Sequence, residues 1–327
     1  MRVLLTGGAG YVGSHAAAAL AEAGHDVTIL DDLSGGHARA VTDFPLIRAD
    51  ITDRERMAAA LAEGRFDAVM HFAALTSVAE SMDHPDRYYR VNVAGSLNLL
   101  EAMAAADCRR LVFSSSAAVY GAPAAIPVPE DHAKAPVNPY GQSKRDVENA
   151  IRWYASAGLL GAVSLRYFNA AGASLDGRLG EDHQPEQHLI PLVLHVALGN
   201  REDISIFGAD YDTPDGTCVR DFVHVCDLAR AHVLALERVT PGRAAAFNVG
   251  TGRGHSVREV IETARAVTGR PIPVRESPRR PGDPPVLVAA AAAIREALGW
   301  RPATPDLEQI VTTAWNWLRT HPDGYGD

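Results

Sequence analysis

Near its start the chain reads Arg2-Val-Leu-Leu-Thr-Gly-Gly-Ala-Gly-Tyr-Val-Gly13, an apolar run that leads directly into a cluster of glycines. The apolar run predicts a short buried β-strand. Gly7, Gly10 and Gly13 have the spacing of a phosphate-binding turn between a strand and a helix. Such glycines permit a tight turn and let backbone amides approach a pyrophosphate at the positive end of a helix dipole. The stretch therefore predicts the first unit of a dinucleotide-binding fold.

The next segments complete this unit. We expect an alanine-rich helix over residues 14–23 and a second strand over residues 26–30. Asp31 and Asp32 follow that strand, where a carboxylate can hydrogen-bond a ribose 2′-hydroxyl. Because a carboxylate repels a 2′-phosphate, the expected cofactor is NAD rather than NADP.

Strand-like runs continue to alternate with helical patterns through the first half of the chain. This alternation predicts an α/β fold built on a doubly wound parallel sheet. After about residue 170 the pattern changes, so we expect an NAD-binding Rossmann domain over 1–170 and a smaller, interleaved α/β lobe over 171–327. Some segments of the second half are expected to return to the first domain. The expected strands of the first domain are 3–6, 26–30, 45–49, 68–72, 110–114 and 162–167.

The composition is that of an ordinary globular protein and argues against several function classes. Of the 327 residues, 47% are hydrophobic and 22% are charged, and the formal net charge is −9. This negative balance argues against a nucleic-acid or anionic-membrane surface. With no run of 18 apolar residues, no leader pattern and only three cysteines, we expect a cytoplasmic protein. The cysteines and thirteen histidines lack Cys-x-x-Cys or His-x-x-His spacing, so no metal is expected.

The run Asn-Pro-Tyr-Gly-Gln-Ser-Lys over residues 138–144 carries the clearest catalytic pattern. A spacing of four places Tyr140 and Lys144 on one face of a helix, one turn apart. An ammonium beside a phenol favours the ionised form, so we expect the pKa of Tyr140 to lie below its ordinary value. Such a phenol can take a proton from an alcohol and later return it. Ser116 follows a predicted strand and supplies a hydroxyl at the edge where crevices open in parallel sheets.

These residues lie in ordered blocks that resemble the extended short-chain dehydrogenase/reductase family, and within it the UDP-glucose 4-epimerases. The blocks include His71-Phe-Ala, Phe113-Ser-Ser-Ser-Ala-Ala-Val-Tyr-Gly121, Arg166-Tyr-Phe-Asn169, Gly216-Thr-Cys-Val-Arg-Asp-Phe-Val-His224 and Pro278-Arg-Arg-Pro-Gly-Asp283. The resemblance spans nearly the whole chain. It implies interconversion of UDP-glucose and UDP-galactose by transient oxidation at C4 with retained NAD, rotation of the 4-keto sugar and hydride return.

The resemblance also implies a role for each site residue. Tyr140 would take the proton of the sugar 4-hydroxyl, Ser116 would hydrogen-bond the same oxygen, and Lys144 would tune Tyr140 and bind the nicotinamide ribose. The further residues implied to contact NAD are Gly7, Gly10, Tyr11, Val12, Gly13, Asp31, Asp32, Asp50, Ile51, Phe72, Ala73, Ala74, Asn92 and Tyr167. Those implied to hold the UDP-sugar, with Ser116 and Tyr140, are Asn169, His188, Leu189, Phe207, Arg220, Arg280 and Asp283. The helices over 86–106 and 139–157 are implied to build a homodimer interface.

A few positions bear on specificity. Thr76 stands where the family often has Lys, and Gln187-His188-Leu189 where it often has Asn-Asn-Leu. Leu287 occupies the position at which the family limits substrate size. A bulky residue there leads us to expect a preference for glucose and galactose over the N-acetylated sugars.

Three alternative functions stay open on the sequence. They are a 4-epimerase of another UDP-sugar (an N-acetylhexosamine, a pentose or a uronate), a net NAD-dependent dehydrogenase, and an idle NAD-sensing protein. The presence of both Tyr140 and Lys144 argues against the idle protein. Ala117 and Ala118 lie beside Ser116, where nucleotide-sugar 4,6-dehydratases carry an acidic pair, and alanine cannot transfer a proton. Dehydration is therefore disfavoured.

Overall fold

A seven-stranded parallel sheet forms the centre of the molecule in the computed structural model, which describes residues 1–280 and 282–326. In spatial order its strands are β11 (Ala244–Val249), β6 (Gly161–Tyr167), β5 (Arg110–Ser116), β4 (Ala68–His71), β1 (Arg2–Thr6), β2 (Asp26–Asp31) and β3 (Leu46–Arg48). All neighbouring strands in the sheet are parallel. The strand order reverses between β1 and β4, which is where a doubly wound sheet opens a crevice at the carboxyl ends of its strands. The predicted fold class is confirmed.

Alternating side chains along the strands build a separate core on each face of the sheet. Val3 and Leu5 face the side covered by α1 (Tyr11–Glu22) and α8 (Val225–Arg238). Leu4 points the other way, toward α2 (Arg54–Gly64), α5 (Ser96–Ala105) and α6 (Pro139–Ser156). All three side chains are fully buried. The continuous apolar run that predicted β1 is therefore explained by a strand with both faces covered.

The two helices predicted over 86–106 and 139–157 are both present, but only the second is a regular α-helix. Helix α6 begins with Pro139, and the Asn138 side chain caps it by accepting a hydrogen bond from the Gly141 amide at 2.8 Å. The first is divided into α4 (Pro85–Tyr88), a π-helical segment (Tyr89–Gly95) and α5. The wider π turns are uncommon and often occur at functional sites.

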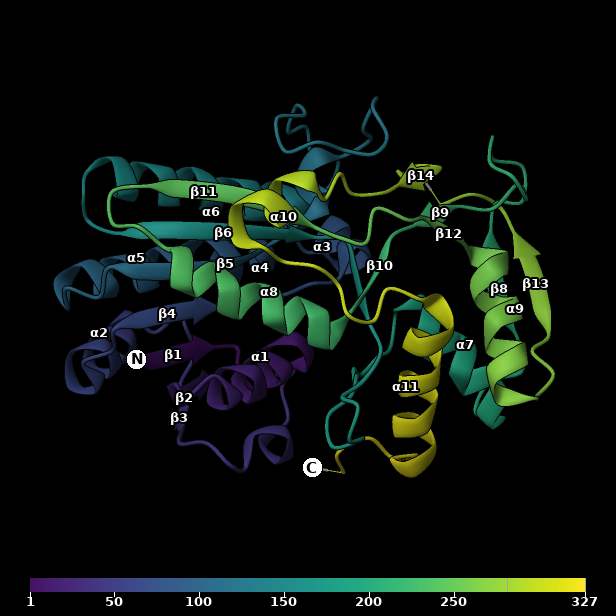
Figure 1. Ribbon diagram of the computed structural model, residues 1–327, viewed down its shortest axis with the longest axis horizontal. Coiled ribbons are helices and arrows are strands. Elements are labelled where there is room, and N and C mark those ends of the chain that lie inside the picture. The colour runs from purple at the N-terminus through teal and green to yellow at the C-terminus, as the bar shows by residue number, and fades with distance from the viewer. Residues whose placement is uncertain (281, 327) are drawn as a thin grey trace.

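The second lobe lies beside the carboxyl edge of the sheet (Figure 1) and contains three small sheets. These are β7 (Asn169–Ala171) with β10 (Phe222–His224), β8 (Ile204–Phe207) with β13 (Val274–Ser277), and β9 (Val219–Arg220) between β12 (His255–Ser256) and β14 (Val286–Leu287). Its helices include α7 (Leu189–Leu198), α9 (Val257–Thr268) and α11 (Leu307–Thr320). The remaining short helices are α3 (Val78–Asp83), α10 (Ala292–Leu298) and the 3₁₀ turns Ala38–Val41 and Ala117–Tyr120. Strand β11 comes from the second half of the chain and pairs with β6; the boundary near residue 170 stays a prediction. Among the described residues, every helix is too short or too polar to cross a bilayer.

A buried ion pair joins α6 to the central sheet. Arg166 on β6 donates from Nε and Nη2 to the two carboxylate oxygens of Glu148 on α6, at 2.8 and 2.7 Å. Only 4% of the Arg166 side chain and 8% of the Glu148 side chain are exposed. Glu148 also accepts from the Ser115 hydroxyl at 2.6 Å, and Arg166 donates to the Tyr120 hydroxyl at 2.8 Å. The pair is therefore the centre of a satisfied polar network that holds α6 against β5 and β6.

Replacing Glu148 by Gln would leave the Arg166 guanidinium buried without a carboxylate. We expect the free energy of unfolding, measured by urea denaturation, to fall by about 3–5 kcal/mol. The matched control is Asp107→Asn, which breaks an exposed pair with Arg109 and should change stability by less than about 1 kcal/mol. A Glu148→Gln variant as stable as the wild type would show that the pair does not hold the helix.

Candidate active site

The glycine turn after β1 is shaped by close backbone contacts. Gly7 has a φ of +71°, and a Cβ there would lie 2.3 Å from the Ala73 amide nitrogen. A Cβ at Gly13 would lie 2.3 Å from the Gly7 carbonyl oxygen. Both positions therefore require glycine for the fold itself, since no side chain can enter such contacts.

Gly10 is different, because a Cβ there would meet only the Gly7 oxygen, at an ordinary contact distance of 3.5 Å. Its φ of −77° is accessible to any residue. The fold itself therefore does not require glycine at this position, which directly precedes α1. Backbone amides at such a helix N-terminus bind anions, and a missing side chain gives a pyrophosphate room to approach. The turn fits the dinucleotide expected from the sequence.

The two predicted acidic residues behave differently in the structure. Asp31 is buried and accepts hydrogen bonds from the amides of Ala9 and Leu33, both at 2.9 Å. Burial raises the pKa of its carboxyl despite these bonds. Asp32 is exposed and bonds the amide and hydroxyl of Ser34. Asp31 therefore fixes the glycine turn, and a contact of either carboxylate with a ribose stays a prediction.

The other residues predicted to contact NAD lie along the carboxyl edge of the same sheet. The amides of Phe72 and Ala73 donate to the Thr6 carbonyl at 2.8 and 2.9 Å, which joins the chain after β4 to the glycine turn. Asn92 is buried and exchanges two hydrogen bonds with the backbone of Leu75, at 2.8 and 3.0 Å. Asn92 is thus a clamp for the loop after β4. Tyr11, Val12, Asp50, Ile51 and Ala74 also follow or adjoin the ends of these strands.

Tyr140 and Ser116 lie together at the end of β5. Tyr140 is 8% exposed and Ser116 is 9% exposed. The neighbouring Ser116 hydroxyl by itself lowers the pKa of Tyr140. The larger effect is burial, which raises the pKa of Tyr140 well above its ordinary value. The expectation of a lowered Tyr140 pKa is therefore wrong for the protein alone, because the energetic cost of burying a phenolate is the dominant influence.

Lys144 lies one turn beyond Tyr140, but its ammonium is held by the backbone. Its Nζ donates to the Ser114 carbonyl at 2.9 Å and lies 6.0 Å from the centre of the Tyr140 ring. Burial lowers the pKa of Lys144 to about 7. The Ser114 hydroxyl in turn hydrogen-bonds the Tyr167 hydroxyl at 2.7 Å. The structure thus brings together Ser116, Tyr140, Lys144 and Tyr167, and their roles in the reaction stay predictions.

Two neighbours of this group were missed by the sequence analysis. His71 hydrogen-bonds Thr6 at 2.7 Å and Ser96 at 2.8 Å, and burial lowers its pKa to about 3. Its imidazole is therefore neutral at physiological pH and connects β1 to α5. Ser143 accepts from Asn92 at 3.0 Å and donates to the Tyr140 carbonyl at 2.7 Å. His71 stands in a quoted family block, whereas Ser143 had no sequence signal beyond its place between Tyr140 and Lys144.

The predicted substrate residues of the second lobe make internal contacts. The Arg280 guanidinium carbon lies 3.7 Å from the centre of the Phe207 ring, a cation–π contact. Arg220 donates to two backbone carbonyls, at 2.9 Å each, and pairs with Asp283 at 3.5 Å. The backbone N–H of Asn169 donates to the Asp221 carbonyl at 3.0 Å. The five residues thus form two groups: Phe207 with Arg280, and Arg220 with Asp283 and Asn169.

The last two predicted substrate residues lie apart from these contacts. Leu189 is the first residue of α7, and His188 precedes it. The His188 Nδ1 atom is 2.6 Å from a Glu181 oxygen and 3.4 Å from a Glu186 oxygen. His188 therefore faces acidic side chains, and a contact with a diphosphate stays a prediction.

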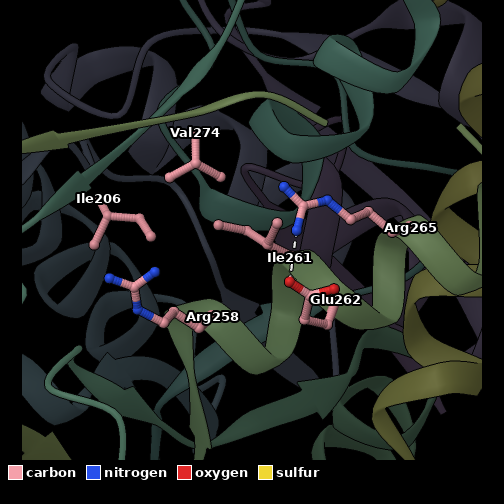
Figure 2. A pocket seen from close by; sticks show the side chains of 6 residues that line it. All are labelled: Ile206, Arg258, Ile261, Glu262, Arg265 and Val274. Carbon is pink, nitrogen blue, oxygen red and sulfur yellow. Dashed lines mark hydrogen bonds and ion pairs between the residues drawn. The ribbon is translucent and has the colours of Figure 1, made fainter. Parts of the chain in front are cut away.

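A shallow hollow in the second lobe lies away from all of these residues. Figure 2 shows it between α9 and the β8–β13 pair. None of the residues predicted for cofactor or substrate is part of its lining. It is lined by Ile206, Arg258, Ile261, Glu262, Arg265 and Val274. We assign it no part in the chemistry.

Comparison with known proteins identifies the family. A model described as the NAD dependent epimerase/dehydratase family matches residues 3–250. The chain belongs to this family. It is 52% identical to the UDP-glucose 4-epimerase of Streptomyces lividans over 329 residues, which cover 100% of this chain and 98% of that protein.

Solved structures of the family agree with this fold closely. The UDP-glucose 4-epimerase of Brucella ovis, solved in complex with NAD, aligns with a TM-score of 0.93 at 45% identity over 96% of this chain and 97% of that one. The enzyme of Bifidobacterium longum, solved with NAD⁺ and UDP, aligns with a TM-score of 0.94 at 36% identity over 99% and 100%. Membership of an NAD-dependent family confirms the predicted cofactor.

The substitution Gly10→Ala tests whether glycine at this position is required for binding the cofactor or for the stability of the fold. We expect Gly10→Ala to keep its melting temperature within about 2 °C of the wild type, because the added Cβ meets no close protein atom. We expect its NAD content, measured by absorbance after denaturation, to fall by at least about tenfold. Gly13→Ala is the control that should disturb both quantities. Full NAD content in Gly10→Ala would contradict the proposed role of the turn.

Proposed function

We propose that the protein is a UDP-glucose 4-epimerase, which interconverts UDP-glucose and UDP-galactose with retained NAD. The observation that carries the proposal is the buried group of Ser116, Tyr140 and Lys144, at the same carboxyl edge of the sheet as the glycine turn of an NAD-dependent fold. High identity over full length to a UDP-glucose 4-epimerase supports the same reaction. The UDP in a related complex supports a UDP-sugar as the ligand of the second lobe.

Tyr140 is the proton-transferring group of the proposed reaction. As a phenolate it accepts the proton of the sugar 4-hydroxyl, and as a phenol it returns that proton to the same oxygen. Ser116 donates a hydrogen bond to the same sugar oxygen and fixes its position. The chemistry that the bound cofactor supplies is reversible hydride acceptance from C4, with a positive charge in the oxidised form that favours a nearby phenolate.

Lys144 couples electrostatically to Tyr140. With a pKa of about 7, Lys144 gains or loses a proton easily near neutral pH. A phenolate at Tyr140 and an ammonium at Lys144 attract one another, so each charge favours the formation of the other. The two charges therefore form together, although burial disfavours each one alone. The Ser114 carbonyl holds the ammonium in position for this role.

The residues proposed for the UDP-sugar bind its nucleotide and diphosphate. Arg220 and Arg280 suit a diphosphate because a planar guanidinium can donate two parallel hydrogen bonds. Phe207 offers an aromatic face to the uracil, and Asp283 an acceptor for the ribose hydroxyls. Arg280 now covers the Phe207 ring, so it must move aside for a base to stack there. Asn169, His188 and Leu189 complete the proposed set.

Incubating the purified protein with UDP-galactose, without added NAD, tests the activity directly. We expect UDP-glucose by chromatography, with no NADH accumulating. Tyr140→Phe should lower turnover by about 10²–10⁴-fold, because it removes one positioned acid–base group, and should keep bound NAD. Tyr154→Phe, on the same helix, is the matched control and should keep turnover. Near-normal turnover of Tyr140→Phe would refute the assignment, and accumulating NADH would point to a net dehydrogenase.

A second candidate, 4-epimerisation of another UDP-sugar, is separated by a panel of UDP-sugars in the same assay. Leu287 on β14 is partly buried and packs beside Tyr120, Phe168 and Ala289. A bulky side chain at this point favours glucose and galactose over the N-acetylated pair. Comparable turnover of UDP-N-acetylglucosamine would overturn this preference.

We also propose that two copies of the chain form a homodimer, through helices within residues 86–106 and 139–157. What supports this is exposed apolar surface: Tyr89 and Leu97 are 43% and 36% exposed, and Trp153 on α6 is 76% exposed. Large apolar side chains gathered on packed helices are typical of protein interfaces.

A cytoplasmic location is proposed from the three free cysteines, two of which are buried.

Trp153→Glu places a charge in the proposed interface. We expect the wild type to elute as a dimer in size-exclusion chromatography with light scattering, and Trp153→Glu as a monomer, because burying an unpaired carboxylate is costly. Leu175→Glu is the matched control: Leu175 is equally exposed, at 76%, but lies outside both helices. A monomeric wild type, or a dimeric Trp153→Glu, would remove support for this interface.

A further inference from the structure

Four metal-ligating side chains converge in the loop between β7 and α7. Glu181, His183, Glu186 and His188 each offer one ligand atom, and these four atoms lie within 4.8 Å of one another. We call this set the Glu/His cluster. The pairwise spacing of histidines and cysteines predicted no metal, because the cluster alternates residue types as Glu-x-His-x-x-Glu-x-His. The loop brings the four side chains together.

The separations between imidazole nitrogens and carboxylate oxygens in the Glu/His cluster run from 2.6 to 3.7 Å, a range that includes the spacing of a tetrahedral cation site. The Nδ1 atoms of His183 and His188 lie 3.3 and 2.6 Å from Oε1 of Glu181. They lie 3.7 and 3.4 Å from the two oxygens of Glu186. Tetrahedral Zn²⁺, with bonds of about 2.0–2.1 Å to nitrogen and oxygen, separates its ligand atoms by about 3.3 Å. The observed distances scatter around that value.

The orientation of the ligand atoms supports the same reading. Glu181 is only 8% exposed, and neither its Oε1 atom nor His183 Nδ1 makes a hydrogen bond with normal geometry among the described residues. Lone pairs directed at one shared point cannot also align with each other, so poor hydrogen-bond geometry at short distance is expected of metal ligands. The Glu186 carboxylate is oriented by the amides of Gln187 and His188, at 2.7 and 2.8 Å. Such outer contacts fix ligands for a metal.

We propose that the Glu/His cluster binds one divalent transition-metal ion of the zinc class, in a closed N₂O₂ site. Four protein ligands leave no open position, so the ion is structural. It fixes a loop that reaches three other parts of the chain. The His183 ring meets the Tyr11 ring edge-on at 6.3 Å, beside the glycine turn. The intervening residue Asp182 bonds His37 at 3.1 Å and the Tyr325 amide at 2.9 Å.

The competing explanation is a set of ion pairs between two imidazolium ions and two carboxylates. The carboxylates raise the pKa of His183 to about 9 and that of His188 well above its ordinary value. The same four atoms would then be satisfied by protons. A zinc ion must displace those protons, so the two states exclude one another and can be distinguished by metal binding.

The test uses the full chain, purified without a histidine tag and treated with chelator. After loading with Zn²⁺ and gel filtration, we expect about one zinc per chain by elemental analysis. The melting temperature should rise by about 3 °C or more over the chelator-treated protein. Co²⁺ in place of Zn²⁺ should give the intense visible absorption of four-coordinate cobalt.

Two variants locate the site. Glu181→Gln and His183→Gln should each lose zinc affinity by more than about 100-fold and lose the thermal response, with circular dichroism reporting whether they fold. His195→Gln is the matched control, because His195 lies on α7 outside the cluster and should keep both properties. No retained zinc and no thermal response in the wild type would overturn the proposal in favour of ion pairs. Unchanged zinc binding by His183→Gln would overturn it too.

Discussion

The buried ion pair between Glu148 and Arg166 positions the helix on which the proposed chemistry depends. Tyr140, Lys144 and Glu148 lie at successive turns on one face of α6, and all three are buried. A buried carboxylate needs a compensating charge, and Glu148 has one in the two hydrogen bonds that it accepts from Arg166. Because α6 is fixed on β5 and β6 in this way, Tyr140 lies beside Ser116 at the end of β5.

The same burial shifts the pKa values of the two titratable groups of the proposed site. In the protein alone it raises the pKa of Tyr140 and lowers that of Lys144, because burial disfavours the charged form of each group. A site of this kind gains most from ligands that supply compensating charge and hydrogen bonds. The neutral His71 adds no charge of its own, since burial lowers its pKa to about 3.

The second lobe shows a comparable pattern of groups that are engaged before any ligand arrives. Arg220 is held by two carbonyls and Asp283, whereas exposed Arg280 rests on the Phe207 ring. For the proposed substrate, Arg220 is therefore preorganised, whereas Arg280 would have to move. The loop carrying the Glu/His cluster lies between this lobe and the glycine turn, through its contacts with Tyr11 and with the start of α7.

The features that depend on residues close together in the chain could be predicted from the sequence. The glycine turn, the alternation of strands with helices and the four-residue spacing of Tyr140 and Lys144 each depend on residues close together in the chain, so the sequence determined the sheet, the cofactor and the proposed catalytic pair. The partner of Lys144, the π-helical turn around Asn92, the stacking of Arg280 and the convergence of Glu181 with His188 had no comparable signal. Each depends on burial or on contacts between distant segments, and those exist only once the tertiary structure has brought the segments together.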